Sequence, residues 1–269
     1  MDTIDYLGQR ARANMHPVMD FTEITYETNN PAGVATITMS RPDALNAITP
    51  HMFAELNEAA AEAANNPTVR FVVLTGAGRA FSAGVDLKAL GERELVDGKV
   101  GDILDLPARE FTSTLHMMKK PTIAKVNGFC FTGALELAMA CDVVVVADEA
   151  KLGDTHAKFG LRPTWGLSQR LPALVGLARA RELSYTARMF SGVEAAAWGL
   201  AARSAPRDRL DEAVAQLIEE MSANSSESFA AYTDLYNAAE RLGVEEGLDY
   251  EATHDYPFSD TAQRLDGFR

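Results

Sequence analysis

Residues 122–147 read TIAKVNGFCFTGALELAMACDVVVVA, and this stretch decides the fold class. Its two ends, Thr122–Val126 and Asp142–Ala147, are short continuous apolar runs, which is the pattern of strands buried on both faces of a sheet. Between them, Gly133–Ala140 has the composition of a helix that is entered through a glycine-containing loop. A buried strand, a helix and a second buried strand predict an α/β protein with a largely parallel sheet.

The same alternation begins earlier in the chain. Val34–Met39 predicts a strand, and Thr49 and Pro50 have the residue types of an N-cap and a first helical residue, opening a helix to about residue 64. Phe71–Thr75 predicts another buried strand. Beyond about residue 208 the pattern is only helical, with one apolar face formed by Leu210, Val214, Leu217, Ile218 and Met221. We therefore expect an N-terminal extension over residues 1–23, a core over 24–207 and a helical C-terminal region over 208–269.

Composition narrows the class of protein. The 269 residues are 47% hydrophobic, enough for one substantial core. Lys and Arg number 25 against 38 Asp and Glu, and 25 − 38 = −13 gives a net charge that disfavours nucleic acid and anionic membranes as partners. No apolar window reaches the roughly 20 residues of a membrane span, and the start of the chain has no signal-peptide pattern. We expect a cytoplasmic protein without membrane insertion, in which Cys130 and Cys141 are buried apolar residues.

Three common kinds of site find no support. Residues 76–78, Gly-Ala-Gly, lack the third glycine of a dinucleotide fingerprint, and there is no phosphate-binding loop. Residues 80–84 resemble a nucleophile elbow, but Ala80 stands where the strained turn needs glycine, which argues against Ser82 as a nucleophile. The five histidines are scattered without metal-ligand spacing, so no metal site is expected.

Two glycine-containing loops remain, at Ala83-Gly84 and at Gly133. Each is predicted to lie just after a buried strand and just before a helix. Backbone N–H groups at such turns have no intrahelical acceptor and favour negative charge, so two converging loops would bind a developing oxyanion. The alternative is that both glycines only allow tight turns and close packing.

Four segments carry a family resemblance: RPDALNA at 41–47, AFSAGVDL at 80–87, PTIAKVNG at 121–128 and GALELAMACD at 133–142. In order and spacing they resemble the enoyl-CoA hydratase/isomerase (crotonase) superfamily, over roughly residues 24 to 260. The resemblance implies repeated ββα units forming a spiral core, and a helical C-terminal trimerisation region. It also implies a homotrimer or hexamer that acts on acyl-CoA thioesters and needs no cofactor, because coenzyme A is part of the substrate.

The resemblance also assigns binding residues. It implies that the N–H groups of Ala83 and Gly133 form an oxyanion hole that polarises the thioester carbonyl, each donor contributing about 3 kcal/mol to transition-state binding. For Arg41 a surface role is an equal alternative. The residues implied to form the substrate-binding wall are Arg41, Ala44, Leu45, Ser82, Gly84, Val85, Asp86 and Leu87.

Glu136 matches the first of the two glutamates with which hydratases of this family hold and activate water, the alternative being a solvated surface glutamate. The position of the second glutamate falls on His156. Hydration would then need His156 as the proton donor, which imidazole chemistry allows because its ordinary pKa is about 6.5. Asp154 is the nearest candidate to orient His156, unless it is only a turn residue.

The leading prediction is a lyase that adds water syn to a 2-enoyl-CoA. The histidine also fits hydrolysis of a β-diketone or thioester, or double-bond isomerisation, with His156 as base. Loss of the second glutamate leaves a non-catalytic acyl-CoA-binding protein as a further alternative. Thr132 and Ala134 add side chains beside Gly133, and Trp165 stands where the family usually has a smaller residue. An inward Trp165 would shorten the acyl tunnel, whereas an outward one would serve a subunit contact.

Overall fold

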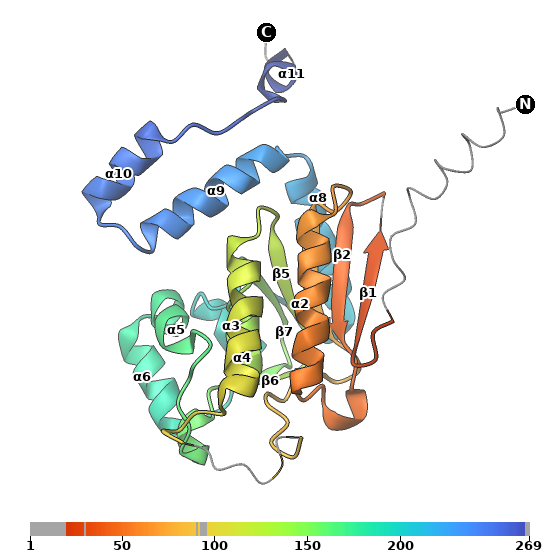
Figure 1. The fold of residues 1–269 in the computed structure, drawn as a ribbon, viewed down its shortest axis with the longest axis vertical. Helices are drawn as coiled ribbons and strands as arrows, with labels where there is room; N and C mark the ends of the chain where they lie inside the picture. The colour runs from red at the N-terminus through yellow and green to blue at the C-terminus, as the bar shows by residue number, and fades with distance from the viewer. Residues whose placement is uncertain (1–19, 30, 90, 92–95, 267–269) are drawn as a thin grey trace, which may run out of the picture.

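The computed structural model describes residues 20–29, 31–89, 91 and 96–266. Their larger sheet has six strands in the order β1-β2-β3-β5-β7-β10. Figure 1 labels β1, β2, β5 and β7 of this sheet. Every neighbouring pair from β2 onward is parallel, which confirms the predicted largely parallel sheet, whereas the antiparallel pairing of β1 with β2 is not predicted. These strands are β1 (Ile24–Asn29), β2 (Val34–Met39), β3 (Phe71–Gly76), β5 (Thr122–Val126), β7 (Val143–Ala147) and β10 (Arg203–Ala205).

A second sheet of short strands has the order β4-β6-β8-β9. Successive strand pairs β3 and β4, β5 and β6, and β7 and β8 each give one strand to each sheet, and each pair is followed by a helix. This is the predicted repeated ββα architecture. The short strands themselves are not predicted, since two or three residues give no readable periodicity. They are β4 (Ala80–Ser82), β6 (Phe129–Phe131), β8 (Lys151–Gly153) and β9 (Phe190–Ser191).

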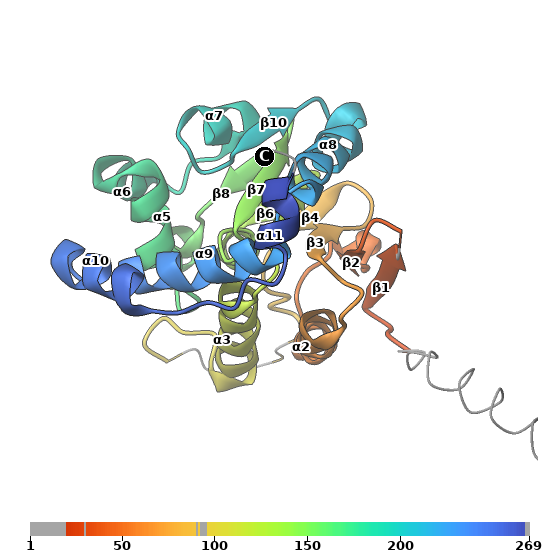
Figure 2. The same cartoon turned by 90° about the horizontal axis from the view of Figure 1, so that it is seen from above.

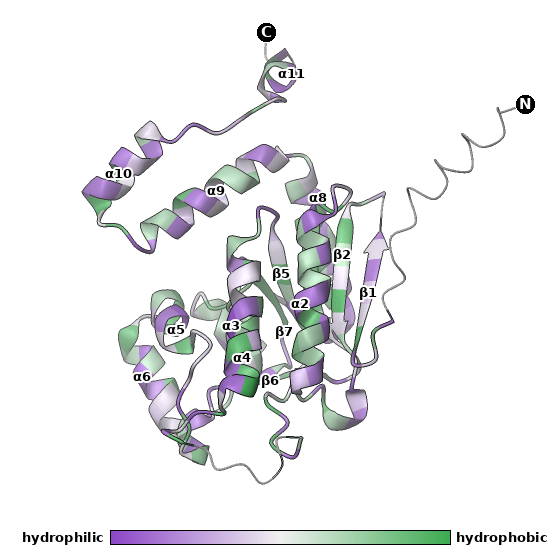
Figure 3. Cartoon of the chain, viewed as in Figure 1, coloured by the Kyte–Doolittle hydropathy of each residue, from purple (hydrophilic) through white to green (hydrophobic). Residues whose placement is uncertain are grey.

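Burial along the strands follows their place in the sheet. Every residue of the central strand β3 is buried, whereas β2 alternates between buried and half-buried positions. Strand β1 at the edge is mostly exposed, and Figure 3 shows its hydrophilic colouring beside the greener β2. A polar edge strand protects an open sheet edge from pairing with other chains.

Helices cover both sides of the larger sheet. Helices α2 (Pro50–Asn65) and α3 (Asp102–Met117) lie side by side on one side, and Figure 2 shows α8 (Leu210–Ser222) on the other. Helix α2 begins as predicted, because the Thr49 hydroxyl accepts the Met52 N–H at 2.9 Å. The shorter helices are α4 (Gly133–Ala138), α5 (Leu167–Val175), α6 (Leu177–Thr186) and α7 (Gly192–Ala197).

The C-terminal region contains only helices within the described residues, as predicted. Helix α9 (Ser226–Ala239) is fastened to the end of α3, where Asn237 donates to the His116 carbonyl at 3.0 Å. Helices α10 (Val244–Thr253) and α11 (Thr261–Leu265) extend away from the core and bury no residue (Figure 1). Residues 1–19 of the expected N-terminal extension lie outside the described residues. Within the described part of the chain, no helix is long and apolar enough to cross a membrane.

Candidate active site

Helix α4 carries two of the predicted site residues, Gly133 and Glu136, in its first turn. Gly133 is the first helical residue, so its N–H has no acceptor one turn earlier and remains available to a ligand. Glycine is needed here because a Cβ would lie 2.3 Å from Cζ3 of Trp165. Thr132 turns the chain from β6 into α4 with a φ of 54°, which is unusual for a β-branched residue, and its hydroxyl lies 2.5 Å from that of Thr155.

The carboxylate of Glu136 is buried, with 1% of the residue exposed, so the alternative of a solvated surface glutamate is wrong. Its Oε1 accepts the backbone N–H groups of Trp165 at 2.9 Å and Leu167 at 3.0 Å, which leaves Oε2 for chemistry. Burial raises the pKa of Glu136 to about 7, against the opposing effects of the Leu167 N–H, His156 and the Trp165 N–H. Such a group exchanges a proton readily near neutral pH.

His156 faces this free carboxylate oxygen. Its Nε2 lies 3.7 Å from Oε2 of Glu136, and its Nδ1 lies 2.7 Å from Oδ1 of Asp154. Because an ionised carboxylate only accepts, Nδ1 carries the hydrogen and Nε2 points at Glu136. Burial alone would raise the pKa of Asp154, but hydrogen bonds from the His156 ring, Ser184 and the His156 N–H outweigh it and hold that pKa below its usual value. Asp154 therefore fixes the direction of the His156 ring.

The first predicted oxyanion donor needs a correction. The N–H of Ala83 donates to the Leu45 carbonyl at 2.9 Å, and the N–H of Gly84 donates to the Ser82 hydroxyl at 3.1 Å, so neither is free. In the bridge between Ile48 and Val85, the Gly84 carbonyl accepts the Ile48 N–H and the Asp86 N–H donates to the Ile48 carbonyl, so the bridge does not use the Val85 N–H. Among the described residues, no acceptor engages the Val85 N–H. Val85, two residues beyond the predicted position, is therefore the available donor.

The predicted helix directly after Gly84 is also wrong. The described residues that follow form turns, with Oδ1 of Asp86 accepting the N–H groups of Lys88 and Ala89, and α3 begins only at Asp102. The Val85 N–H is therefore unpaired in a bridge that is followed by a turn, and not at the start of a helix as predicted.

The two available N–H donors and the catalytic pair line one cavity of about 140 Å³, to which Val85, Gly133, Glu136 and His156 all contribute. A larger cavity of about 420 Å³ lies under α9, but neither Glu136 nor His156 lines it, and we place the site in the smaller one. The Trp165 side chain faces inward, which resolves the open choice about its direction. The lining residues are Ala83, Val85, Leu87, Val100, Thr132, Gly133, Glu136, Thr155, His156, Phe159, Leu161, Arg162, Thr164 and Trp165.

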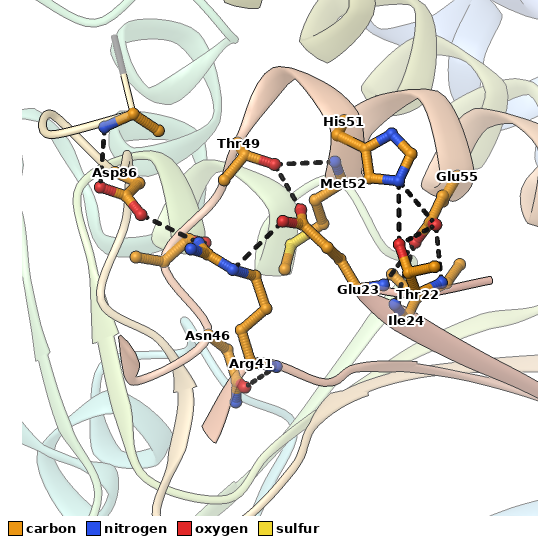
Figure 4. A network of polar contacts seen from close by, with 12 residues as sticks. Thr22, Glu23, Ile24, Arg41, Asn46, Thr49, His51, Met52, Glu55 and Asp86 are labelled. Atoms are coloured by element: carbon orange, nitrogen blue, oxygen red, sulfur yellow. Dashed lines mark hydrogen bonds and ion pairs between the residues drawn. The ribbon is translucent and has the colours of Figure 1, made fainter. Parts of the chain in front are cut away.

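The other predicted wall residues do not line the cavity, but Arg41 connects the two segments that contain them. The Arg41 guanidinium lies between two carboxylates, 3.2 Å from Glu23 and 3.0 Å from Asp86, and it also donates to the Ala47 carbonyl at 2.6 Å (Figure 4). Glu23 in turn accepts the Thr49 hydroxyl. Arg41 thereby joins the 41–49 segment to the segment that contains Val85. Ala44, Leu45, Ser82, Gly84 and Asp86 belong to these two segments and do not line the cavity.

The fold and this geometry can be compared with known proteins. Residues 29–269 match the sequence profile described as "Enoyl-CoA hydratase/isomerase". The chain belongs to the enoyl-CoA hydratase/isomerase family.

Relatives in the family include a "Probable enoyl-CoA hydratase" of Mycobacterium tuberculosis, 36% identical over 85% of this chain and 88% of that protein. A "Probable enoyl-CoA hydratase 1, peroxisomal" of Arabidopsis thaliana is 41% identical over 57% of this chain and 56% of its own. Among solved structures, an enoyl-CoA hydratase of Bacillus anthracis superposes with a TM-score of 0.83 at 29% identity, covering 92% of this chain and 96% of that one. The ββα architecture is thus that of crotonase-fold enoyl-CoA hydratases.

Two site residues of this family member escape sequence reasoning. The sequence indicates Val85 only as part of the substrate-binding wall, because motif spacing does not reveal which N–H the Leu45 carbonyl accepts. Asp105 on α3 is buried and accepts hydrogen bonds from the Trp165 indole at 2.8 Å and the Thr164 hydroxyl at 2.7 Å. The only signal for Asp105 in the sequence is an acidic residue near a helix start, which usually indicates a favourable helix dipole interaction.

Proposed function

We propose that this protein is an enoyl-CoA hydratase that adds water syn across the double bond of a 2-enoyl-CoA. The observation that carries the proposal is the pairing of Glu136 Oε2 with His156 Nε2 at 3.7 Å, in a cavity also lined by Val85 and Gly133. Separations of this size allow one water molecule to contact both groups. The family relationship supports the same reaction.

The thioester carbonyl oxygen would accept the N–H groups of Val85 and Gly133. Two such donors stabilise the enolate that forms when a nucleophile attacks the β-carbon, at about 3 kcal/mol for each donor. This hydrogen bonding withdraws electrons from the double bond and makes the β-carbon electrophilic.

The two side chains then divide the proton transfers. Ionised Glu136 takes one proton from water as the oxygen bonds to the β-carbon, and protonated His156 gives its Nε2 proton to the α-carbon. Asp154 stabilises the imidazolium before that transfer. The proton that Glu136 took from water then passes to His156 across the short gap. This transfer restores the ionised Glu136 and the protonated His156, and the net reaction is the addition of one H₂O.

The test is to incubate purified protein with crotonyl-CoA and to follow the loss of the conjugated thioester absorbance. A mass increase by one water in the product supports hydration. If enoyl-CoAs of every chain length persist unchanged, the proposal is wrong.

A second candidate is thioester or β-diketone hydrolysis, which the Asp154–His156 pair favours. An imidazole oriented by a buried carboxylate, as here at 2.7 Å, is a suitable base for water attacking a carbonyl. Release of free CoA or of a cleaved acid, measured by mass spectrometry, would identify this activity, and hydration would leave the CoA bonded.

We further propose that the protein acts in the cytoplasm as a homotrimer or hexamer and needs no cofactor apart from the CoA of its substrate. The exposed apolar residues of α10, Val244 at 84% and Leu248 at 61%, support a subunit contact in the helical C-terminal region. Light scattering on the protein as it elutes from a size-exclusion column measures the mass of the assembly. A monomer mass at micromolar concentration would contradict the proposed trimer or hexamer.

A further inference from the structure

The indole of Trp165 forms a rigid wall of the cavity. The residue is 3% exposed, and its ring covers Gly133 so closely that a Cβ there would be 2.3 Å from Cζ3. Phe53 of α2 packs against the indole in a T-shaped arrangement, with ring centroids 5.2 Å apart and planes at 86°. The ring therefore fills the space directly beside one proposed oxyanion donor.

Asp105 fixes the direction of this indole. One carboxylate oxygen accepts both the indole N–H at 2.8 Å and the Thr164 hydroxyl at 2.7 Å. One turn later on α3, Arg109 donates to the Thr164 carbonyl at 3.2 Å. Hydrogen bonds to a charged acceptor are strong, and leaving Asp105 buried without them is costly. The indole therefore cannot swing away while α3 stays in place.

The Trp165 backbone is held as well. Its N–H donates to Glu136, and its carbonyl accepts from Arg170 at 3.0 Å. Both the ring and the main chain of this residue are thus fixed against the catalytic helix, and a ligand cannot widen the cavity on this side by a simple rotamer change.

The volume that remains is small. The cavity that Trp165 lines has about 140 Å³, a third of the roughly 420 Å³ of the cavity under α9. We infer that Trp165, positioned by Asp105, closes the acyl site and restricts the substrate to short acyl chains. Trp165 is then a specificity-determining residue, and Asp105 is a positioning residue. The inference rests on the proposed function only in that the ligand is an acyl-CoA.

Binding of saturated acyl-CoAs tests this without any turnover. The chain has two tryptophans, and Trp198 packs against Arg179 and Arg188 outside the cavity. The W198F variant therefore leaves Trp165 as the one indole, whose fluorescence reports on the site. We expect butyryl-CoA to change this emission and to bind at least tenfold more tightly than decanoyl-CoA. Equal affinity for the two, or an emission that butyryl-CoA leaves unchanged, overturns the inference.

Variants separate a specificity wall from ordinary core packing. In W165A, decanoyl-CoA should gain at least tenfold in affinity relative to butyryl-CoA. W165F keeps most of the bulk but loses the hydrogen bond to Asp105, so it should weaken the short-chain preference less than W165A does. D105A should weaken the preference several-fold, and D105N should preserve it because the Asn carbonyl still accepts both hydrogen bonds. A D105A protein with the wild-type preference would contradict the positioning role. If W165A does not fold, the affinities of the wild-type protein and the comparison of D105A with D105N still test the inference.

The outcomes for chain length and for reaction type are independent. A protein that prefers butyryl-CoA but hydrates no enoyl-CoA retains this inference and loses the proposed function. A protein that hydrates enoyl-CoAs but binds decanoyl-CoA as well as butyryl-CoA retains the proposed function and loses this inference.

Discussion

The two carboxylate oxygens of Glu136 have different roles. Oε1 accepts two backbone N–H groups, which fix the side chain, and Oε2 remains available to act on water. E136Q keeps an acceptor for both N–H groups but removes the base. We expect kcat to fall by about 10²- to 10⁴-fold with the segment at Trp165 undisturbed. Hydration of crotonyl-CoA measures the loss, and a variant with wild-type kcat would show that Glu136 is not the base.

The same residue makes stability depend on pH. Burial raises the pKa of Glu136 from 4.5 to about 7, so between these values the folded protein binds more protons than the unfolded chain. The free energy of unfolding must therefore fall as pH rises from about 4.5 to 7, by up to about 3 kcal/mol from this group. E136Q should lose this part of the dependence, which urea titrations of both proteins at pH 5 and pH 8 would measure. Wild-type hydration should rise over the same range as Glu136 ionises.

Asp154 acts on the reaction through His156. In D154N the imidazolium loses its charge partner, and the amide N–H can donate to Nδ1 and reverse the tautomer. We expect kcat for hydration to fall at least tenfold with a smaller change in KM. A D154N enzyme with the wild-type kcat and pH profile would contradict this role.

At the scale of elements, α4 can begin where it does because Gly133 has no side chain. G133A places a methyl group against the Trp165 ring, which Asp105 and Phe53 prevent from moving. We expect a loss of about 1–3 kcal/mol in unfolding free energy, together with reduced activity. Gly243 is the matched control, since a Cβ there meets nothing within 4 Å, and equal effects of G133A and G243A would contradict the packing argument.

The elements that the sequence predicts are those with long local signals. The buried runs of β3, β5 and β7 and the Thr49 cap of α2 need only their own residues to be recognised. The site divides in the same way. Glu136 and His156 are identified by the resemblance of their motifs to the family, whereas the free N–H at Val85 and the inward Trp165 depend on contacts with Leu45 and Asp105, far away in the chain. Local patterns contain no information about such pairings.

At the scale of the whole molecule, α10 buries no residue although it carries large apolar side chains. Covering them against a second copy would remove apolar surface from water at about 25 cal/mol per Å². We expect L248D to lower the assembled mass measured by light scattering. V193D, at an exposed apolar residue of α7, should leave it unchanged. An unchanged mass for L248D would place the subunit contact elsewhere.

The burial of the Glu136–His156 pair also bears on the origin of the hydrogen in the product. Glu136 is 1% exposed and His156 is 8% exposed, so a proton passing between them meets little bulk solvent. The hydrogen delivered to the α-carbon in one turnover is then the one taken from the water of the preceding turnover. Enzyme equilibrated in H₂O and then mixed rapidly with an enoyl-CoA in D₂O should therefore give a first-turnover product that carries protium at its α-carbon, whereas free exchange with the solvent would place deuterium there.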